Sequence, residues 1–486
     1  MKKNILLFLG MALLGSTAIA DKILLLNSNL DSLQARFDYI QNAQSEIKVQ
    51  YFSIDKDYLS FSTLAILRDA AARGVKVKIL VDAMHNDILK QTMSALLLSL
   101  TPEKKSNIEI KVYNSFNLLR PLRYTKRMHD KGLIIDDKAM ISGGRNIANG
   151  FFGRSGERKI LPIFEDSDAL ILESRSIHNA SEYFNDLWNS KFVSSASLGQ
   201  FSASSLKRLR CPGKTDAASC ERTRQRNVKL VQQEEERINE FIQAFKARQT
   251  ADAYEAQDWN NLATEVGPIE FLYDDVRTQP SNLDKPEHNI ASQLYNFIQQ
   301  AQESVTIITP YLVITPEQES LFRQLRERNI RVNLYTNSKA ANDVSAAHVG
   351  YEKTRELALR HNVNLYEYQG PDTLHAKLAL IDGKTFYIGS FNWDYRSQNL
   401  NREVGLIVNL PAYRDTALRH DIDEKFGRIA RNSCLVRSST CSPVSNVQLS
   451  DLSETELNNL IHVAKKRDRA NARFFRLIYP LIKKQL

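Results

Sequence analysis

One stretch of sequence occurs twice in this chain, once in each half. Residues 128–146 read MHDKGLIIDDKAMISGGRN, and residues 374–392 read LHAKLALIDGKTFYIGSFN. Each copy has a His, a Lys two positions later and an Asp five positions after the Lys, and an acidic turn separates two apolar runs. Apolar runs on either side of such a turn are typical of a β-hairpin. The repeat therefore predicts two similar halves, each with one hairpin.

The His and Lys of each copy are expected on one face of a strand. Side chains alternate between faces along a strand, so His129 should lie beside Lys131, and His375 beside Lys377. A single match to this pattern would mean little, but two copies with the same flanking sequence favour a functional pair. Together the two half-sites would form one cationic pocket, which suits a phosphate group.

Two further residue types recur in the repeat. Asp136 and Asp382 complete the catalytic motif, but each falls in the turn, where a structural hydrogen-bond acceptor is the favoured role. Asn146 and Asn392 follow their histidines at the same offset and return along the second strand of the hairpin. We expect these amides to bind the nonbridging phosphate oxygens together with the two lysines.

The motifs resemble a known family. HDKGLIID and HAKLALID, with GGRN and GSFN downstream, resemble the paired HKD motifs of the phospholipase D superfamily. Longer stretches, AQSEIKVQYFSID, GGRNIANGFF and GSFNWDYRSQNLNREVG, are similar to bacterial cardiolipin synthases and secreted phospholipases D. The resemblance covers most of the chain. It implies a pseudo-twofold pair of lobes with one shared active site, and a ping-pong reaction through a covalent phosphohistidine.

The resemblance also implies roles for individual residues. His129 matches the nucleophile, and His375 matches the group that acts first as acid and then as base. The family has an acidic residue that binds the other ring nitrogen of each His. In the second half this residue matches Glu403, and in the first half FEDSDALIL offers Asp166 and Asp168, of which the strand alignment favours Asp168.

The two copies differ at one position of the family pattern. Ser390 follows Gly389, as the pattern usually has it, and is expected among the phosphate-binding residues. The first copy has Gly144 at that offset, so one half lacks a hydroxyl contact. The superfamily tolerates glycine there, so the difference does not exclude activity.

The first twenty residues, MKKNILLFLGMALLGSTAIA, have the form of a secretory signal peptide, with cleavage expected after Ala20. An uncleaved anchor is the alternative, but the apolar run is shorter than the about 20 residues that span a bilayer. Four cysteines form two close pairs, Cys211 with Cys220 and Cys434 with Cys441. In a periplasmic or secreted protein these favour disulfides, with a zinc site as the weaker alternative.

The order of predicted elements is duplicated. AQSEIKVQYFSID near residue 43 is answered by AQESVTIITPYLVI near residue 301, and a helix, a turn and an alternating strand follow each. This predicts an α/β fold of two similar lobes, each a mixed β-sheet flanked by helices. The expected divisions are a signal peptide (1–20), a first lobe (21–200), a linker with a helical insertion (201–265), a second lobe (266–445) and a basic amphipathic C-terminal helix (446–486).

Two of these segments have open interpretations. The helical insertion is expected to pack on a lobe as a connector, and a lid over the pocket is the alternative. The C-terminal helix is expected to pack on its own domain, with contact to an anionic membrane surface as the alternative.

The pattern as a whole predicts an exported enzyme that cleaves or transfers the phosphatidyl group of glycerophospholipids at a membrane surface. The net charge of +9 and the pI near 9.1 favour anionic partners, but they do not separate phospholipid from nucleic acid. A metal-independent nuclease of the same superfamily is the alternative, and a non-catalytic lipid-binding protein is a third reading. We expect no metal, no cofactor, no nucleic-acid partner, and a monomer, because both motifs stand in one chain.

Overall fold

The structure is a computed structural model that describes residues 20–55, 57–85, 102–115, 125–153, 163–195, 257–276, 289–412 and 416–436, with a few isolated residues between 216 and 236. The predicted signal peptide up to residue 19, most of the predicted insertion and the predicted C-terminal helix lie outside the described residues. Cys211, Cys220 and Cys441 lie outside them too. Cys434 is disulfide-bonded, but its partner is not described, so the pairing stays a prediction.

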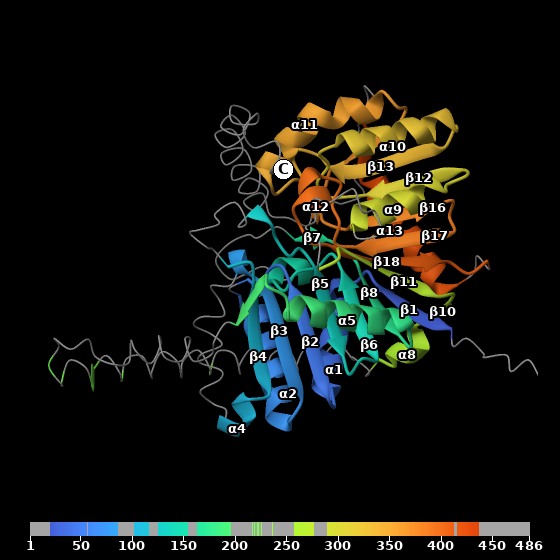
Figure 1. The fold of residues 1–486 in the computed structure, drawn as a ribbon. Coiled ribbons are helices and arrows are strands. Elements are labelled where there is room, and N and C mark those ends of the chain that lie inside the picture. The colour runs from blue at the N-terminus through green and yellow to red at the C-terminus, as the bar shows by residue number, and fades with distance from the viewer. Residues whose placement is uncertain are drawn as a thin grey trace, which may run out of the picture.

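The first lobe is built on a mixed sheet of nine strands in the order β10-β1-β8-β6-β5-β2-β3-β4-β9 (Figure 1). The pairings β2–β3 and β3–β4 are parallel, and the other pairings in this sheet are antiparallel. In chain order the strands are β1 (Asp21–Leu26), β2 (Glu46–Tyr51), β3 (Lys76–Asp82), β4 (Ile108–Tyr113), β5 (Lys131–Ile135), β6 (Ala139–Gly143), β8 (Asp168–Leu172), β9 (Val193–Ser195) and β10 (Thr264–Val266).

The second lobe repeats this arrangement with eight strands in the order β11-β18-β17-β16-β12-β13-β14-β19. The order matches the first sheet strand for strand once β10 is set aside. The strands are β11 (Ile269–Tyr273), β12 (Ser304–Ile308), β13 (Arg331–Asn337), β14 (Asn364–Tyr368), β16 (Leu378–Ile381), β17 (Thr385–Gly389), β18 (Val404–Asn409) and β19 (Ser433–Leu435). The predicted α/β fold of two similar lobes is confirmed.

Helices flank both sheets, and side-chain caps fix several of their ends. Asp57 caps the start of its helix and Gly74 ends the same helix in the left-handed conformation. A capping box of Thr315 and Gln318 begins another. The helices are α1 (Asn29–Asn42), α2 (Tyr58–Arg73), α4 (Pro102–Lys105), α5 (Arg175–Trp188), α8 (Trp259–Leu262), α9 (Ile290–Gln299), α10 (Pro316–Glu327), α11 (Ser345–Leu359), α12 (Tyr395–Asn399) and α13 (Ala417–Arg431), with short 3-10 turns η1 (Ala83–His85) and η4 (Asn149–Phe152).

Both repeated motifs form the predicted hairpins, β5–β6 and β16–β17. The turn residues Asp136 and Asp137 have φ of 54° and 52°, and Asp382 and Gly383 have φ of 52° and 64°. Two consecutive residues with positive φ are the signature of a type I′ turn, whose twist matches that of the strands. Asp and Gly are the residue types that accept this conformation most readily.

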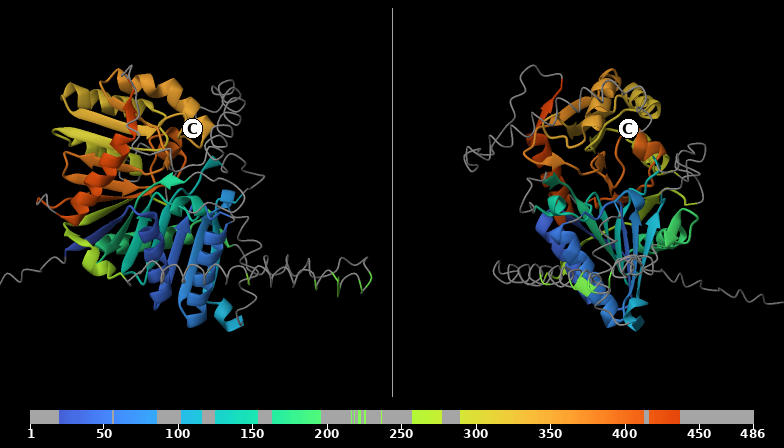
Figure 2. Two further views of the ribbon diagram at one scale, coloured as in Figure 1. Left: turned by 180° about the vertical axis from the view of Figure 1, so that it is seen from behind. Right: turned by 90° about the vertical axis from the view of Figure 1, so that its left-hand side faces the viewer.

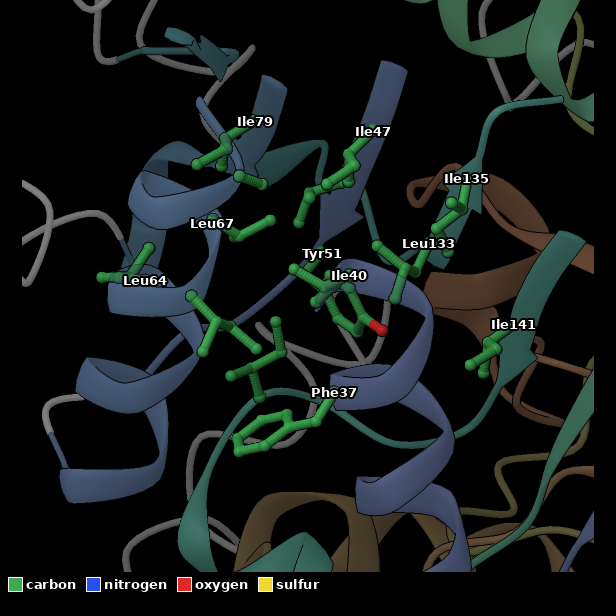
Figure 3. Close-up of a cluster of buried hydrophobic side chains, with 14 of the residues drawn as sticks. Phe37, Ile40, Ile47, Tyr51, Leu64, Leu67, Ile79, Leu133, Ile135 and Ile141 are labelled. Carbon is green, nitrogen blue, oxygen red and sulfur yellow. The ribbon is translucent and has the colours of Figure 1, made fainter. Parts of the chain in front are cut away.

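Among the described residues, one hydrophobic core is shared by the two lobes. In the first lobe α1 and α2 cover one face of the sheet, where Phe37, Ile40 and Leu67 pack on Ile47 and Ile79 (Figure 3). The opposite faces of the two sheets meet each other: α5 contacts β11 of the second lobe, and α13 contacts β1 of the first. Figure 2 shows the lobes stacked from two further sides. Across the described ranges, no helix combines the length and the apolar character needed to cross a membrane.

Candidate active site

Both histidines lie where the two lobes touch. His129 lies two residues before β5, and its backbone N–H donates to the carbonyl of Arg402 in the other lobe at 2.8 Å. His375 lies just before β16, and its N–H donates to the carbonyl of Glu165 in the other lobe, also at 2.8 Å. A short parallel pairing of β7 (Phe164–Glu165) with β15 (Thr373–Leu374) holds the second crossing. Each lobe therefore lays an extended segment beside the histidine of its neighbour.

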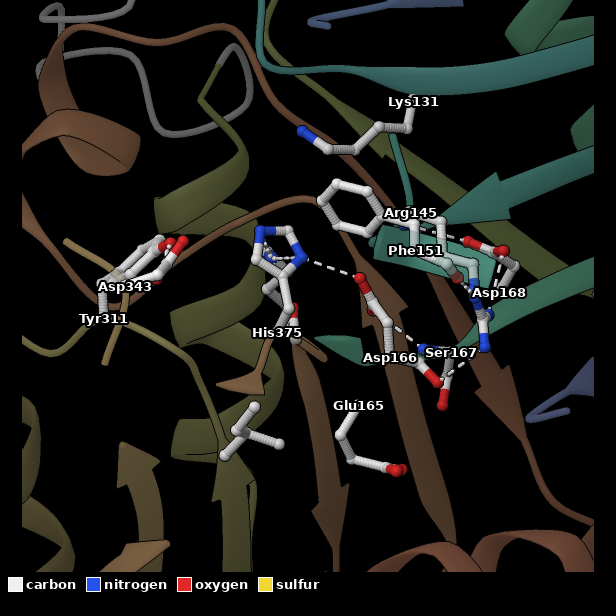
Figure 4. Close-up of polar contacts among 12 residues, drawn as sticks. Lys131, Arg145, Phe151, Glu165, Asp166, Ser167, Asp168, Tyr311, Asp343 and His375 are labelled. Carbon is white, nitrogen blue, oxygen red and sulfur yellow. Dashed lines mark hydrogen bonds and ion pairs between the residues drawn. The ribbon is translucent and has the colours of Figure 1, made fainter. Parts of the chain in front are cut away.

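These crossings place an acid from one lobe on the histidine of the other. Glu403 follows Arg402, and its Oε2 lies 2.9 Å from Nδ1 of His129. Asp166 follows Glu165, and its Oδ2 lies 2.7 Å from Nδ1 of His375 (Figure 4). From the sequence, Glu403 was assigned to His375 and the acid of the first half to His129. The structure exchanges the two acids between the lobes, so this assignment was wrong. A carboxylate at Nδ1 fixes the neutral ring with its proton on that atom and leaves the lone pair on Nε2.

The prediction of Asp168 as a histidine partner was also wrong. Asp168 begins β8 and is fully buried within the first lobe. Its Oδ2 pairs with Arg36 at 2.9 Å and with Arg145 at 3.1 Å, and accepts a hydrogen bond from Ser32. Asp166 precedes the strand, next to the segment that crosses to the other lobe. Of the two acids, Asp166 is therefore the one that reaches His375.

The Gly144 and Ser390 difference follows from the lengths of the two acids. A Cβ atom at Gly144 would lie 2.1 Å from Oδ1 of Asp166, closer than any side chain allows. At the equivalent place the acid is Glu403, whose longer side chain holds its carboxylate farther from its own backbone. Ser390 fits there, and its Oγ donates to Oε2 of Glu403 at 2.6 Å. The same Oγ accepts from the backbone of Val404 at 3.0 Å. The prediction of Ser390 as a phosphate-binding residue was therefore wrong, because its hydroxyl positions an acid.

Other hydrogen bonds hold the acids in their ionised form. Oε1 of Glu403 accepts from Ser397 at 2.6 Å and from Asn401 at 3.1 Å. Burial raises the pKa of Glu403, but His129 and the nearby cations outweigh burial, and the net pKa is lowered. Burial also raises the pKa of Asp166, but the interaction with His375 lowers it by more. The pKa of this carboxyl therefore falls well below its usual range.

The cationic side chains of the motifs crowd one buried space. Nζ of Lys131 donates to the carbonyl of His129 at 2.6 Å, and Nζ of Lys377 lies 2.9 Å from Nδ1 of His375. Burial lowers the pKa of Lys131 to about 7, with the charge of Lys377 as the next cause. Burial lowers the pKa of Lys377 to about 8.

The histidines respond in the same way. Burial lowers the pKa of His129 to about 4 and that of His375 to about 3, and the neighbouring lysines add to both effects. A bound phosphodiester anion would favour the charged form of every one of these groups. The pocket is therefore electrostatically suited to an anion.

Asp136 and Asp382 have structural roles, as their place in the turn indicated. Asp136 accepts from the backbone N–H groups of three successive residues, 44 to 46, at 2.8 to 2.9 Å. Asp382 accepts from residues 302 to 304 in the same way and over the same distances. Both carboxylates lie at the turn end of the hairpin, remote from the histidine end. Counting them as catalytic was wrong, since they tie each hairpin to the start of β2 or β12.

Asn146 and Asn392 follow β6 and β17 and are buried. The structure gives the side-chain oxygen of each amide no hydrogen-bond partner within the described part of the chain. Because buried polar atoms are normally satisfied, these two amides are available to a ligand. Their predicted contact with phosphate stays a prediction.

Several residues of the site were missed from the sequence. Phe52 meets the ring of His129 edge-on at 5.1 Å, and Phe151 meets that of His375 at 5.0 Å. Lys425, buried in α13, donates to the carbonyl of Asp166 at 2.6 Å and pairs with Glu165. A lysine on the apolar face of a helix is an available sequence signal, whereas the two aromatic walls have no signal beyond their nearness to the motifs.

Comparison with known proteins agrees with this geometry. A family described as "Cardiolipin synthase, PLD-like domain" matches residues 37–188 and 294–429, which include both histidine–acid pairs. The chain belongs to this family. Cardiolipin synthase C of Escherichia coli K12 is 27% identical over 431 residues, which are 82% of this chain and 83% of the relative. Cardiolipin synthase 1 of Bacillus anthracis is 24% identical over 80% of this chain and 62% of the relative.

The solved structure of phosphatidylserine synthase from Haemophilus influenzae Rd KW20 has the same fold. It superposes with a TM-score of 0.61 at 15% identity and covers 96% of this chain and 97% of its own. Membership in the cardiolipin synthase family makes the chain a phosphatidyltransferase or phospholipase D-type enzyme.

Proposed function

We propose that this protein is an exported phosphatidyltransferase that moves the phosphatidyl group of a glycerophospholipid to an alcohol. The observation that carries the proposal is the pair of histidines, each held by a carboxylate of the opposite lobe. The carboxylate at Nδ1 leaves Nε2 of each ring for a substrate, and the charges of Lys131 and Lys377 act on both rings. Two imidazoles that share a phosphodiester can divide the work of nucleophile and acid.

In the first step Nε2 of His129 attacks phosphorus, and the bond from phosphorus to the headgroup oxygen breaks. His375, charged once the anionic diester has raised its pKa, gives its proton to the departing oxygen. Lys131, Lys377 and the amides of the motifs hold the nonbridging oxygens as charge builds. In the second step the acceptor alcohol gives its proton to His375 and attacks phosphorus, and the phosphohistidine bond breaks. Water in place of the alcohol gives hydrolysis.

Transfer is the favoured outcome because the relatives at 27% and 24% identity are named as cardiolipin synthases. Export rests on the form of the first twenty residues.

Lipid mass spectrometry tests this proposal. The purified mature protein is incubated, with EDTA present, with vesicles of phosphatidylglycerol and phosphatidylethanolamine and with added glycerol. We expect cardiolipin or headgroup-exchanged lipid as the main product, and neither product from His129→Ala or His375→Ala. Phosphatidic acid as the main product would make the protein a hydrolase. Unchanged lipid together with plasmid cleavage would make it a nuclease.

The identity of the nucleophile has its own test. Phosphatidyl-p-nitrophenol needs no acid for the departure of its leaving group, so His375→Ala should release about one equivalent of p-nitrophenol and then stall, because the base of the second step is missing. The peptide that contains His129 should then carry the phosphatidyl mass. An adduct on the peptide of His375 in the His129→Ala protein would reverse the two roles.

A further inference from the structure

One side of the active site carries two polar side chains that the histidine–acid pairs do not use. Tyr311, in the loop after β12, donates its hydroxyl to Oδ1 of Asp343 at 2.9 Å. The rings of Tyr311 and His375 meet at right angles, with centroids 6.2 Å apart. Figure 4 shows both side chains on the side of the imidazole turned away from Asp166. The pair therefore borders the ring edge that carries Nε2.

This pair is reachable from solvent, unlike the residues beneath it. Asp343 is exposed and Tyr311 partly exposed, whereas His375 is only 5% exposed. The position of Tyr311 is fixed, because the carbonyl of this residue accepts from Thr309 at 3.0 Å and the chain pairs with the 393 region at Leu312. A carboxylate accepts about four hydrogen bonds, and a phenol oxygen accepts as well as donates. The pair thus offers acceptor atoms at a fixed place beside His375.

The two histidines differ in this respect. The isolated bridges at Ile54 and at Leu312 are equivalent in the two lobes, so Ser53 of the first lobe corresponds to Tyr311. Ser53 donates to its neighbour Asp55. Within the described part of the chain, the ring that contacts His129 is Phe52, which brings no polar group. The hydroxyl–carboxylate pair therefore recurs in both lobes, but only at His375 does the hydroxyl belong to the aromatic ring that the described structure places against the imidazole.

We propose that Tyr311 and Asp343 form the subsite for the alcohol that leaves or enters at phosphorus, and that they recognise a second hydrogen-bond donor on it. This donor is a hydroxyl or an ammonium group a few bonds from the reacting oxygen. The inference rests on the proposed function, in which the alcohol lies opposite His129 and therefore beside His375. A carboxylate repels the phosphate that the lysines attract. It therefore binds the donor group of the alcohol and does not compete for the phosphodiester.

A partition experiment tests the subsite. Phosphatidyl-p-nitrophenol forms the covalent intermediate without a natural headgroup, and three acceptors then compete for it: 1-propanol, glycerol and ethanolamine. The measured quantity is the ratio of the glycerol or ethanolamine product to the 1-propanol product, which does not depend on how much protein is folded. We expect Asp343→Asn to lower at least one ratio about tenfold, as the loss of a charge-assisted hydrogen bond implies, and Tyr311→Phe to lower the same ratio less.

The arms of the experiment separate the possible alcohols. A loss confined to ethanolamine identifies an ammonium subsite, and a loss for glycerol identifies a polyol subsite. A matched control is Tyr351, which donates to Glu367 at 2.7 Å between α11 and β14, and Tyr351→Phe should leave both ratios as in the wild type. Unchanged ratios in Asp343→Asn would overturn the inference while transfer still occurs. Wild-type protein that forms no phosphatidyl product from any acceptor would overturn the proposed function itself.

Discussion

At the residue scale, Asp166 and Asp168 stand two positions apart and do different work. Asp166 orients His375, and Asp168 neutralises Arg36 and Arg145 in the first lobe. We expect Asp166→Asn to lower the turnover of transfer about 100-fold with little change in melting temperature, because a group that positions a reacting residue is lost. Asp168→Asn should instead destabilise the fold by about 3 kcal/mol, because two buried guanidinium groups lose their counter-charge.

Turnover per folded molecule and urea unfolding separate these effects. If Asp168→Asn lost turnover at full stability, the assignment of Asp166 to His375 would be wrong.

Gly144 gives a second prediction at this scale. The serine found at the equivalent position of the other lobe is expected to fail here, because its Cβ would lie 2.1 Å from Asp166. Gly144→Ser should therefore move the acid off His375 and lower turnover about 10- to 100-fold. Gly267→Ala is the control, since a Cβ atom there meets nothing within 4 Å. Wild-type turnover in Gly144→Ser would show that Asp166 can move without loss.

The lowered pKa of His129 predicts a pH dependence of stability. Its pKa falls from 6.5 unfolded to about 4 folded, so below pH 6.5 the unfolded chain binds a proton that the folded chain does not. The free energy of unfolding should therefore decrease as the pH falls from 6.5 to 4. Urea unfolding across this window should give a shallower slope for His129→Ala than for the wild type. An unchanged slope in His129→Ala would contradict this prediction.

At the element scale, helix α13 supports the crossing segment that carries Asp166. Lys425 of this helix is buried, donates to the carbonyl of Asp166 and pairs with Glu165. Lys425→Met should loosen the segment and lower turnover about tenfold, with less effect on KM. Lys48→Met removes a similarly buried lysine, which pairs with Asp137 at 2.8 Å in the β5–β6 turn, and it should cost stability without this loss of turnover per folded molecule. Equal turnover in both variants would contradict the positioning role of Lys425.

The elements that the sequence predicted are those whose signals are local. The type I′ turns at Asp136 and Asp382 follow from short-range chemistry, and the alternation of apolar residues along each strand identifies the hairpins. The choice between Asp166 and Asp168 depends on where β8 begins, and strand ends are the least certain part of any reading of a sequence. The exchange of acids between lobes has no local signal, because it arises from how the lobes pack. The role of Ser390 depends on the pairing of β17 with β18 inside the second lobe, which brings its hydroxyl to Glu403.

At the scale of the whole molecule, the crossing of acids makes the site a property of the complete chain. His129 depends on Glu403, and His375 depends on Asp166, so neither lobe holds a finished half-site. The shared core of α5, α13 and the central strands fixes the two lobes against each other. One chain therefore contains all four residues of the two pairs, and no second copy is needed to complete them.

This completeness predicts the outcome of mixing two inactive variants. His129→Ala and His375→Ala each lack one reacting group, and their mixture should remain inactive, since each chain pairs its histidines with its own acids. The two proteins are mixed after separate folding, and again after joint unfolding and refolding, and transfer to glycerol is measured. If chains exchanged lobes, about a quarter of the random combinations would regain both histidines at a given pseudo-twofold site. Activity that appears only after joint refolding would therefore show a lobe-swapped assembly, and activity in neither mixture supports a site made within one chain.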